Sequence, residues 1–316
     1  MQFSIFPDFP VICPNSRCSS HPPLGCEGPS LPLRVRKRGT FRRKDSLSHI
    51  RRYDCSRCHR SFSRSTFEAE FRQQVRVHNE TIQRLCVSGL SIRRMALLLG
   101  LSRELVARRI QLYGGLAQRE LQKELKERSQ DPRRLVTELQ FDELETIEHT
   151  KLKPLSIGLA VETSSRRILG ISVASMPCGG PLAHCSRKKY GPRKDERAKK
   201  ASELFASLRP VVHPSSLKIR TDQKTLYPQW LKAHFPQMKH EAYKGRRGCV
   251  VGQGELKKIG FDPLFSLNHT AAMLRANINR LFRRTWCTTK KPERLLRHLY
   301  LYVRFHNSVL LENPAL

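Results

Sequence analysis

The hydrophobic positions between residues 79 and 115 recur at the three- and four-residue spacing of an α-helix. They form three groups separated by short polar breaks: Ile82, Leu85 and Cys86; then Ile92, Met95, Ala96 and Leu99; then Leu105, Val106 and Ile110. This spacing gives each segment one apolar face, so it predicts three short helices that pack against one another.

The polar breaks between these groups contain residues that start and end helices. Ser91 and Ser102 stand where N-caps of the second and third helices are needed, and Gly100 lies in the short turn between them. Two short helices joined in this way predict a helix-turn-helix. Its last helix, about 102–113, would present three basic side chains to DNA: Arg103, Arg108 and Arg109. The alternative is an ordinary three-helix packing motif.

From residue 135 the hydrophobic period changes from helical to that of strands. Three strand-like segments, 135–141, 155–161 and 167–174, follow one another with short polar turns between them. A basic, Gly- and Pro-rich insertion (176–197) comes next. We then expect a helix at 198–208, a strand at 217–223, and helices at 226–235, about 263–284 and about 291–306. Three antiparallel strands followed by alternating helix and strand are the order of a ribonuclease-H-like α/β domain.

These patterns divide the chain into four parts. Residues 1–65 form a Cys-rich, zinc-ribbon-like segment that includes a basic arm (33–44), and 66–115 form the all-α helix-turn-helix. A charged helix makes 116–134 a linker, and 135–316 form the α/β domain.

The charge balance points to a polyanionic partner. The 316 residues include 59 Lys and Arg but only 27 Asp and Glu, a net charge of +32. Nucleic acid is the commonest partner for such a chain, and an anionic membrane surface is the rival. No apolar run is longer than about the five residues 95–99, so we expect no membrane-spanning helix and no membrane partner. The first residues lack the features of a secretion signal.

Four of the ten cysteines form two close pairs, Cys13 with Cys18 and Cys55 with Cys58. Two such pairs, brought together by a longer loop, supply the four thiolates of a structural Zn²⁺ site. The first pair is looser than the usual two-residue spacing, so Cys26, His21 or His59 could replace one ligand. The rival interpretation is a set of scattered reduced thiols.

One short stretch, "LQFDELETIEHT" (139–150), concentrates acidic residues in this basic chain. Along its strand, Asp142 points away from Leu139 and Phe141, at the expected strand end. Asp222 has the same relation to Ile219 and Thr221. Two aspartates at the ends of adjacent strands can hold Mg²⁺ beside a phosphodiester. Glu145 and Glu148 have an equal claim to be surface loop acids paired with Lys or Arg.

The cysteine pairs, the helix-turn-helix, "FDE" (141–143), "TD" (221–222) and "LRANINRLFRRTWCTTKK" (274–291) together resemble a known family. They are similar to bacterial insertion-sequence transposases of the insertion-sequence-one type, which are DDE transposases with a ribonuclease-H-like core. The resemblance covers about residues 10–306. It implies metal-dependent hydrolysis at the element's ends, followed by strand transfer into target DNA. It also implies Mg²⁺ or Mn²⁺ as cofactor, a homo-oligomer on DNA, and a place at the nucleoid in the bacterial cytoplasm.

The resemblance also suggests site residues, with one departure. In the family, a Glu on the long helix is the third carboxylate, and Asn268 stands at the matching position here. The implied catalytic set is Asp142, Asp222 and Asn268, with Asp142, Asp222 and Glu143 as Mg²⁺ ligands. Either Asn268 is a variant ligand, or Glu143 or Glu255 completes the site, or the chain is inactive.

A cluster of basic residues near the C-terminus would cradle the DNA backbone. Its members are Arg275, Arg280, Arg283, Arg284, Lys290 and Lys291. Two rival functions use the same residues: a DNA-binding protein derived from a transposase without its chemistry, and an RNA-binding or RNA-cleaving protein.

Overall fold

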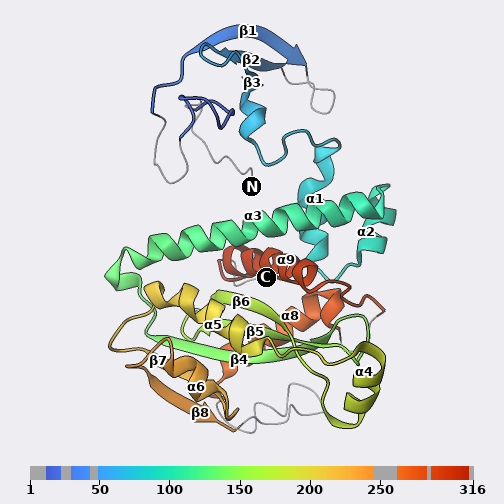
Figure 1. Cartoon of the computed structure of the whole chain (residues 1–316), viewed down its shortest axis with the longest axis vertical. Helices are drawn as coiled ribbons and strands as arrows, with labels where there is room; N and C mark the ends of the chain where they lie inside the picture. The colour runs from blue at the N-terminus through green and yellow to red at the C-terminus, as the bar shows by residue number, and fades with distance from the viewer. Residues whose placement is uncertain (1–11, 23–29, 43–48, 245–261, 283–285, 313–316) are drawn as a thin grey trace. The chain divides into compact units, whose positions relative to one another are not determined.

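The computed structural model describes residues 12–22, 30–42, 49–244, 262–282 and 286–312. It divides into two compact units, Met1–Glu80 and Thr81–Leu316 (Figure 1). The helices of the expected helix-turn-helix therefore belong to the same unit as the large sheet.

The first unit is built on a three-stranded antiparallel sheet of β1 (Val35–Arg42), β2 (His49–Cys55) and β3 (Ser61–Ser63), in the order β1-β2-β3. Short 3-10 turns follow at Arg64–Phe67 and Arg76–His78. Most of the expected basic arm is thus strand β1. Nearly all side chains of β1 are exposed, so the strand is held by backbone pairing with β2 and has no apolar face for a hydrophobic pattern to show.

The helices that follow are α1 (Asn79–Cys86), most of which belongs to the second unit, α2 (Ile92–Leu99) and α3 (Arg103–Ser129). Both predicted N-caps are confirmed: Ser91 accepts a hydrogen bond from the backbone of Arg94 at 3.2 Å, and Ser102 from that of Leu105 at 3.1 Å. Gly100 ends α2 in the left-handed conformation, with φ 62°.

Helix α3 continues for 27 residues, so the predicted break between a helix ending at 113 and a charged helix from 116 is absent. Gly114 and Gly115 lie inside it. A Cβ added to Gly114 would stand 2.2 Å from the carbonyl oxygen of Arg297 on α9 (Pro292–Phe305). The glycine therefore marks a close approach between two helices and does not end one.

The large sheet is mixed and has five strands in the order β6-β5-β4-β7-β8. They are β4 (Glu138–Ile147), β5 (Pro154–Glu162), β6 (Ile168–Ser175), β7 (Lys218–Asp222) and β8 (Lys239–Tyr243). β4, β5 and β6 form an antiparallel meander, whereas β7 joins β4 in parallel and β8 joins β7 in parallel. The first four strands were predicted, and β8 was not.

Helices cover both faces of this sheet (Figure 1). Among the described residues, the helices around it, besides α3 and α9, are α4 (Ala183–Tyr190), α5 (Arg197–Leu208), α6 (Tyr227–Lys232) and α8 (Phe265–Asn277). On one face, Phe205 of α5 packs against Phe141 of β4 at 4.8 Å between ring centroids. On the other face, Gln140 of β4 is bonded to the start of α8.

The last two helices were predicted with different success. The expected helix at 291–306 matches α9, but the expected long helix 263–284 ends at Asn277, because Ile278 takes an extended conformation. Short turns stand at Pro132–Arg134, Gly180–Leu182, Arg209–Val211, Asn279–Leu281 and His306–Leu310. In the described part of the chain, every helix is too short or too polar to cross a membrane.

Candidate metal centres

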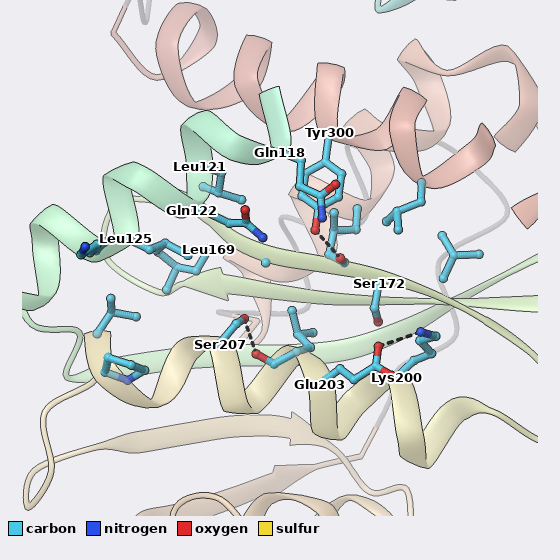
Figure 2. A pocket seen from close by; sticks show the side chains of 18 of the residues that line it. Gln118, Leu121, Gln122, Leu125, Leu169, Ser172, Lys200, Glu203, Ser207 and Tyr300 are labelled. Carbon is cyan, nitrogen blue, oxygen red and sulfur yellow. Dashed lines mark hydrogen bonds and ion pairs between the residues drawn. The ribbon is translucent and has the colours of Figure 1, made fainter. Parts of the chain in front are cut away.

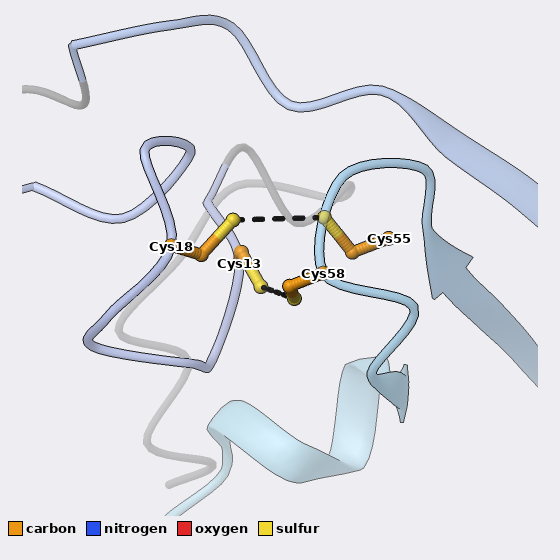
Figure 3. Close-up of side chains that lie close together, drawn as sticks. All are labelled: Cys13, Cys18, Cys55 and Cys58. Carbon is orange, nitrogen blue, oxygen red and sulfur yellow. Dashed lines mark hydrogen bonds between the residues drawn. The ribbon is translucent and has the colours of Figure 1, made fainter.

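The four predicted cysteines of the first unit meet at one point (Figure 3). The sulfur atoms of Cys13 and Cys58 lie 3.5 Å apart, and those of Cys18 and Cys55 lie 3.8 Å apart. All four lie within 4.8 Å of one another, and none is in a disulfide. Four thiolates at ~2.3 Å from a tetrahedral Zn²⁺ stand ~3.8 Å from each other, so these spacings fit a closed zinc shell.

Backbone hydrogen bonds hold each cysteine pair in a tight turn. The N–H of Cys55 donates to the carbonyl of Arg60 at 3.1 Å, and the N–H of His59 donates back to Cys55 at 2.9 Å. His59 takes a left-handed conformation, with φ 57°, to close this turn. In the first pair, Cys13 donates from its backbone to Ser20 at 2.7 Å. The turns aim both thiols of a pair in one direction.

The alternative ligands fit less well than the four cysteines. The Nδ1 atom of His21 forms a hydrogen bond with the carbonyl of Cys13 at 2.6 Å. His59 has the left-handed backbone conformation that closes the turn. Cys26 lies outside the described residues. Burial raises the pKa of the Cys13 thiol to about 12, so this thiol stays protonated at neutral pH unless a cation stands beside it.

A second candidate centre lies in the large sheet, where Asp142 of β4 and Asp222 of β7 are neighbours. Phe141 pairs with Thr221 in the parallel register, so the two aspartates that follow share a face of the sheet. Asp142 is not at the end of its strand as predicted, because β4 continues to Ile147 alongside β5. It lies where β7 ends, which leaves that side of β4 open.

The surroundings of Asp142 favour its neutral form. Burial, and then the charge of Asp222, raise the pKa of Asp142 from 3.8 to about 6. Its Oδ1 accepts hydrogen bonds from the backbone of Glu143 at 2.7 Å and from the hydroxyl of Tyr227 at 3.0 Å. Burial and the nearby carboxylates raise the pKa of Tyr227, so its hydroxyl stays a donor. A divalent cation would offset the repulsion between the two aspartates.

Glu143, a predicted Mg²⁺ ligand, already has three partners. Its side chain is only 5% exposed and forms an ion pair with Lys224. It also accepts from the hydroxyl of Ser156 at 2.6 Å and from Tyr227 at 3.4 Å. Sequence reasoning missed Lys224 and Tyr227, although both stand within five residues of Asp222. In this arrangement Glu143 holds the side chains of Lys224 and Tyr227 next to Asp142.

Asn268 lies near the start of α8 and is exposed. Its amide nitrogen donates to Asp262 at 2.7 Å, and Asp262 also accepts a hydrogen bond from the backbone of Leu264, just before the helix, at 2.9 Å. This bond leaves the amide oxygen of Asn268 as its remaining ligand atom. Glu255, the other candidate for the third position, lies outside the described residues.

The remaining acids of the 139–150 stretch have other surroundings. Glu148 pairs with Lys153 at 2.8 Å and with Arg193 at 3.4 Å, and Glu145 is exposed in β4. Within the described residues, the four cysteines are the one group of three or more His, Cys, Asp or Glu side chains close enough to share a metal ion. The carboxylate centre is therefore a pair of aspartates and not a closed shell.

The predicted DNA-binding residues divide by exposure. Arg103 and Arg108 of α3 are exposed, as are Lys290 and Lys291 before α9. Arg109 was expected to point outward, but it is buried, because its position on α3 falls beside Val106, Ile110 and Tyr113 on the packed face. Arg275 and Arg280 are half-buried, and Arg283 and Arg284 lie outside the described residues.

No protein-family model and no curated protein matches the sequence.

Proposed function

We propose that this chain is a DDE-type DNA transposase of an insertion sequence, which binds element ends and catalyses metal-dependent cleavage and strand transfer. The observation that carries the proposal is the placement of Asp142 and Asp222 side by side on adjacent parallel strands. Carboxylates in that relation are suited to hold Mg²⁺ or Mn²⁺ against a phosphodiester.

The sheet supports the same proposal. Three antiparallel strands followed by two parallel strands, in the order β6-β5-β4-β7-β8, are what a ribonuclease-H-like domain requires, with β4 central and its aspartate beside β7. A net charge of +32 supports a nucleic-acid substrate. The exposed Arg103 and Arg108 would contact DNA near the start of α3, and the cysteine centre would hold a structural Zn²⁺.

The residues around the aspartates have separate roles in this proposal. Asp142 and Asp222 would hold the cation, which would supply charge stabilisation for the attacking and leaving oxygens of a phosphodiester displacement. Tyr227 donates a hydrogen bond to Oδ1 of Asp142, which leaves Oδ2 as the oxygen available to a cation. Lys224 neutralises Glu143, which keeps a third negative charge from repelling the DNA backbone.

The test is cleavage of a DNA fragment that carries the terminal repeats flanking the gene, in Mg²⁺ or Mn²⁺. We expect Asp142→Asn and Asp222→Asn to abolish strand cleavage while DNA binding in a gel-shift assay remains. Glu127→Gln is the matched control, because Glu127 is an exposed carboxylate on α3 whose partner is Lys123. Full activity in both aspartate variants would remove these residues from the mechanism.

A second candidate function is favoured by Asn268, which replaces a carboxylate with an uncharged amide. Under this alternative the chain binds DNA as a catalytically degenerate derivative of a transposase. The wild-type protein would then bind the terminal repeats without cutting them in either metal. Cleavage that requires Asp142 and Asp222 would exclude this alternative.

A further inference from the structure

Strand β6 forms one edge of the large sheet, and its outward backbone groups are satisfied at both ends by other parts of the unit. At the start, the side-chain amide of Asn307 bonds both the N–H and the carbonyl of Ile168, at 3.0 and 2.9 Å. At the end, the carbonyl of Ser175 accepts from the backbone of Glu196 at 2.9 Å, and its N–H donates to the Glu196 carboxylate at 3.4 Å. At both ends, the N–H and the carbonyl of one β6 residue are thus paired as they would be with a neighbouring strand.

Between these two ends the edge is open. The pairing of β6 with β5 runs without a shift from Gly170 to Ser175, so Ile171 and Val173 point their backbone groups outward as Ser175 does. The carbonyl of Ile171 accepts a long bond, 3.5 Å, from the hydroxyl of Tyr300. Within the described residues, no partner meets the N–H of Ile171 or the N–H and carbonyl of Val173.

These backbone groups face a cleft of about 450 Å³ between α3 and α5 (Figure 2). Apolar side chains line it from three sides, with Leu121 and Leu125 on α3, Leu169 on β6 and Leu204 on α5. Buried backbone groups without partners are rare in folded proteins and carry a free-energy cost. The cleft therefore combines apolar walls with a row of unused hydrogen-bonding groups.

We propose that this cleft accepts an extended peptide segment of a partner protein, which adds to the sheet as a sixth strand beside β6. Only a peptide backbone supplies donors and acceptors at the spacing that an open sheet edge presents. In an antiparallel pairing, one residue of the segment would exchange both hydrogen bonds with Val173, and a residue two positions along would bond the N–H of Ile171.

The residues that line the walls and rim of the cleft also indicate which side chains the partner segment carries. Alternate residues of the strand would meet the leucines of α3 on one side and Leu204 on the other, so the segment is apolar on both faces. At the rim stand Lys126, Lys200 and Glu203, which together carry one positive charge. In a chain of net charge +32 this favours acidic residues on either side of the apolar run.

The experiment uses the full chain and a fluorescein-labelled synthetic peptide of sequence EEVIVIVEE, followed by fluorescence anisotropy. We expect saturable binding, and at least a tenfold loss when the central valine is N-methylated, because that peptide keeps its side chains but loses a backbone donor. Absence of binding up to about 1 mM, or equal binding of the N-methylated peptide, would overturn the proposal.

Two variants sharpen the test. Val173→Pro removes an outward N–H without breaking a bond to β5, and proline is tolerated on sheet edges, so binding should fall at least tenfold. Cys185→Ser is the control, because Cys185 is exposed on α4 and does not line the cleft, so its binding should match the wild type. Equal binding of Val173→Pro and wild type would contradict the proposal.

If Val173→Pro fails to fold, amide hydrogen exchange on the wild type decides. The amides of Ile171 and Val173 should exchange faster than those of Gly170, Ser172 and Ala174, and the peptide should slow them selectively. Peptide binding that leaves both amides unprotected would show that the segment lies elsewhere. A concentration-dependent dimer that protects the same two amides without peptide would assign the edge to a second copy and overturn the assignment to a partner protein.

Discussion

The cysteine centre and the aspartate centre differ in how much of the site the chain itself supplies. The four sulfurs lie within 4.8 Å of one another and come from two local turns, so the protein alone provides a full tetrahedral shell. The aspartate centre has two carboxylates brought together by strand pairing, with Tyr227 and the backbone of Glu143 as donors to one of them. It leaves coordination positions for other ligands.

This contrast separates two uses of a metal. A closed shell of buried thiolates has no place for a substrate, and its binding free energy goes into holding the fold together. An open pair of hard carboxylates suits a cation that keeps waters and takes phosphate oxygens. The same contrast decides what removal of a ligand should do to the stability of each unit.

The largest effect should follow removal of ligands from the closed shell. Cys55→Ser with Cys58→Ser should abolish stoichiometric zinc and unfold the first unit, because structural zinc sites contribute about 10–16 kcal/mol of apparent binding free energy. Zinc content, and limited proteolysis of the full chain mapped to residues 1–80, measure this. Cys185→Ser, at an exposed cysteine, is the control and should keep one zinc per chain. Retained zinc in the double variant would refute the assignment.

In the open centre, we expect removal of a ligand to stabilise the metal-free protein, whereas removal of the cysteines destabilises the first unit. The pKa of Asp142 is raised from 3.8 to about 6, so ionising it in the metal-free fold opposes folding by about 3 kcal/mol. This destabilisation is fully present above pH 6 and disappears as the pH falls toward 3.8. Asp142→Asn should therefore stabilise the metal-free protein at pH 7 and leave its stability nearly unchanged near pH 4.

Urea unfolding of the metal-free protein at the two pH values measures this effect. The Asn side chain keeps an acceptor oxygen for Tyr227, so the hydrogen bond to that residue is preserved. A variant that is less stable than wild type at pH 7 would show that Asp142 is stabilised by its surroundings and contradict the repulsion between the two carboxylates.

A packing change far from both centres should lower the stability of the second unit without affecting zinc binding in the first. Gly114→Ala places a methyl group against the backbone of Arg297, so α3 and α9 must separate, at a cost of about 2 kcal/mol. Gly115→Ala is the matched control, since its methyl group would meet only the flexible end of the Arg297 side chain at 3.3 Å. Thermal unfolding should show the second unit destabilised by Gly114→Ala, with zinc content unchanged. Equal melting temperatures for the two variants would contradict the close approach.

The smallest effect concerns one hydrogen bond of the open centre. Tyr227→Phe removes the donor to Asp142 and should lower the free energy of unfolding by about 1 kcal/mol at pH 8, where the carboxylate is charged. Tyr243→Phe removes a similar bond, 2.9 Å to Glu241, at the edge strand β8 and serves as the comparison. A loss no greater than that of Tyr243→Phe would mean that Tyr227 does not hold the Asp142 carboxylate.

Local chemistry could be predicted from the sequence where few residues decide the outcome. Ser91, Ser102 and Gly100 were placed correctly because caps and turns depend on their own residues. The four cysteines were placed correctly because the ligand type and spacing leave few arrangements. The strands β4, β5 and β6 follow from their apolar runs.

Features that depend on distant partners were missed. Strand β1 is polar along its length and exists through pairing with β2, and β8 through pairing with β7. Arg109 has the charge of a surface residue, but its position on α3 places it on the packed face. Tyr227 carries no acidic or metal-binding pattern of its own, so its role near Asp142 required the folded arrangement.

Helix α3 has a mechanical consequence. Arg103 stands in its first turn, and Lys126 at the rim of the β6 cleft lies 23 residues later on the same unbroken helix, ~35 Å away. Sharp kinks in helices have local causes such as proline, and α3 has no proline and no break. If the proposed DNA contacts at Arg103 and Arg108 rotate the start of α3, the wall of the cleft that carries Lys126 would move with it.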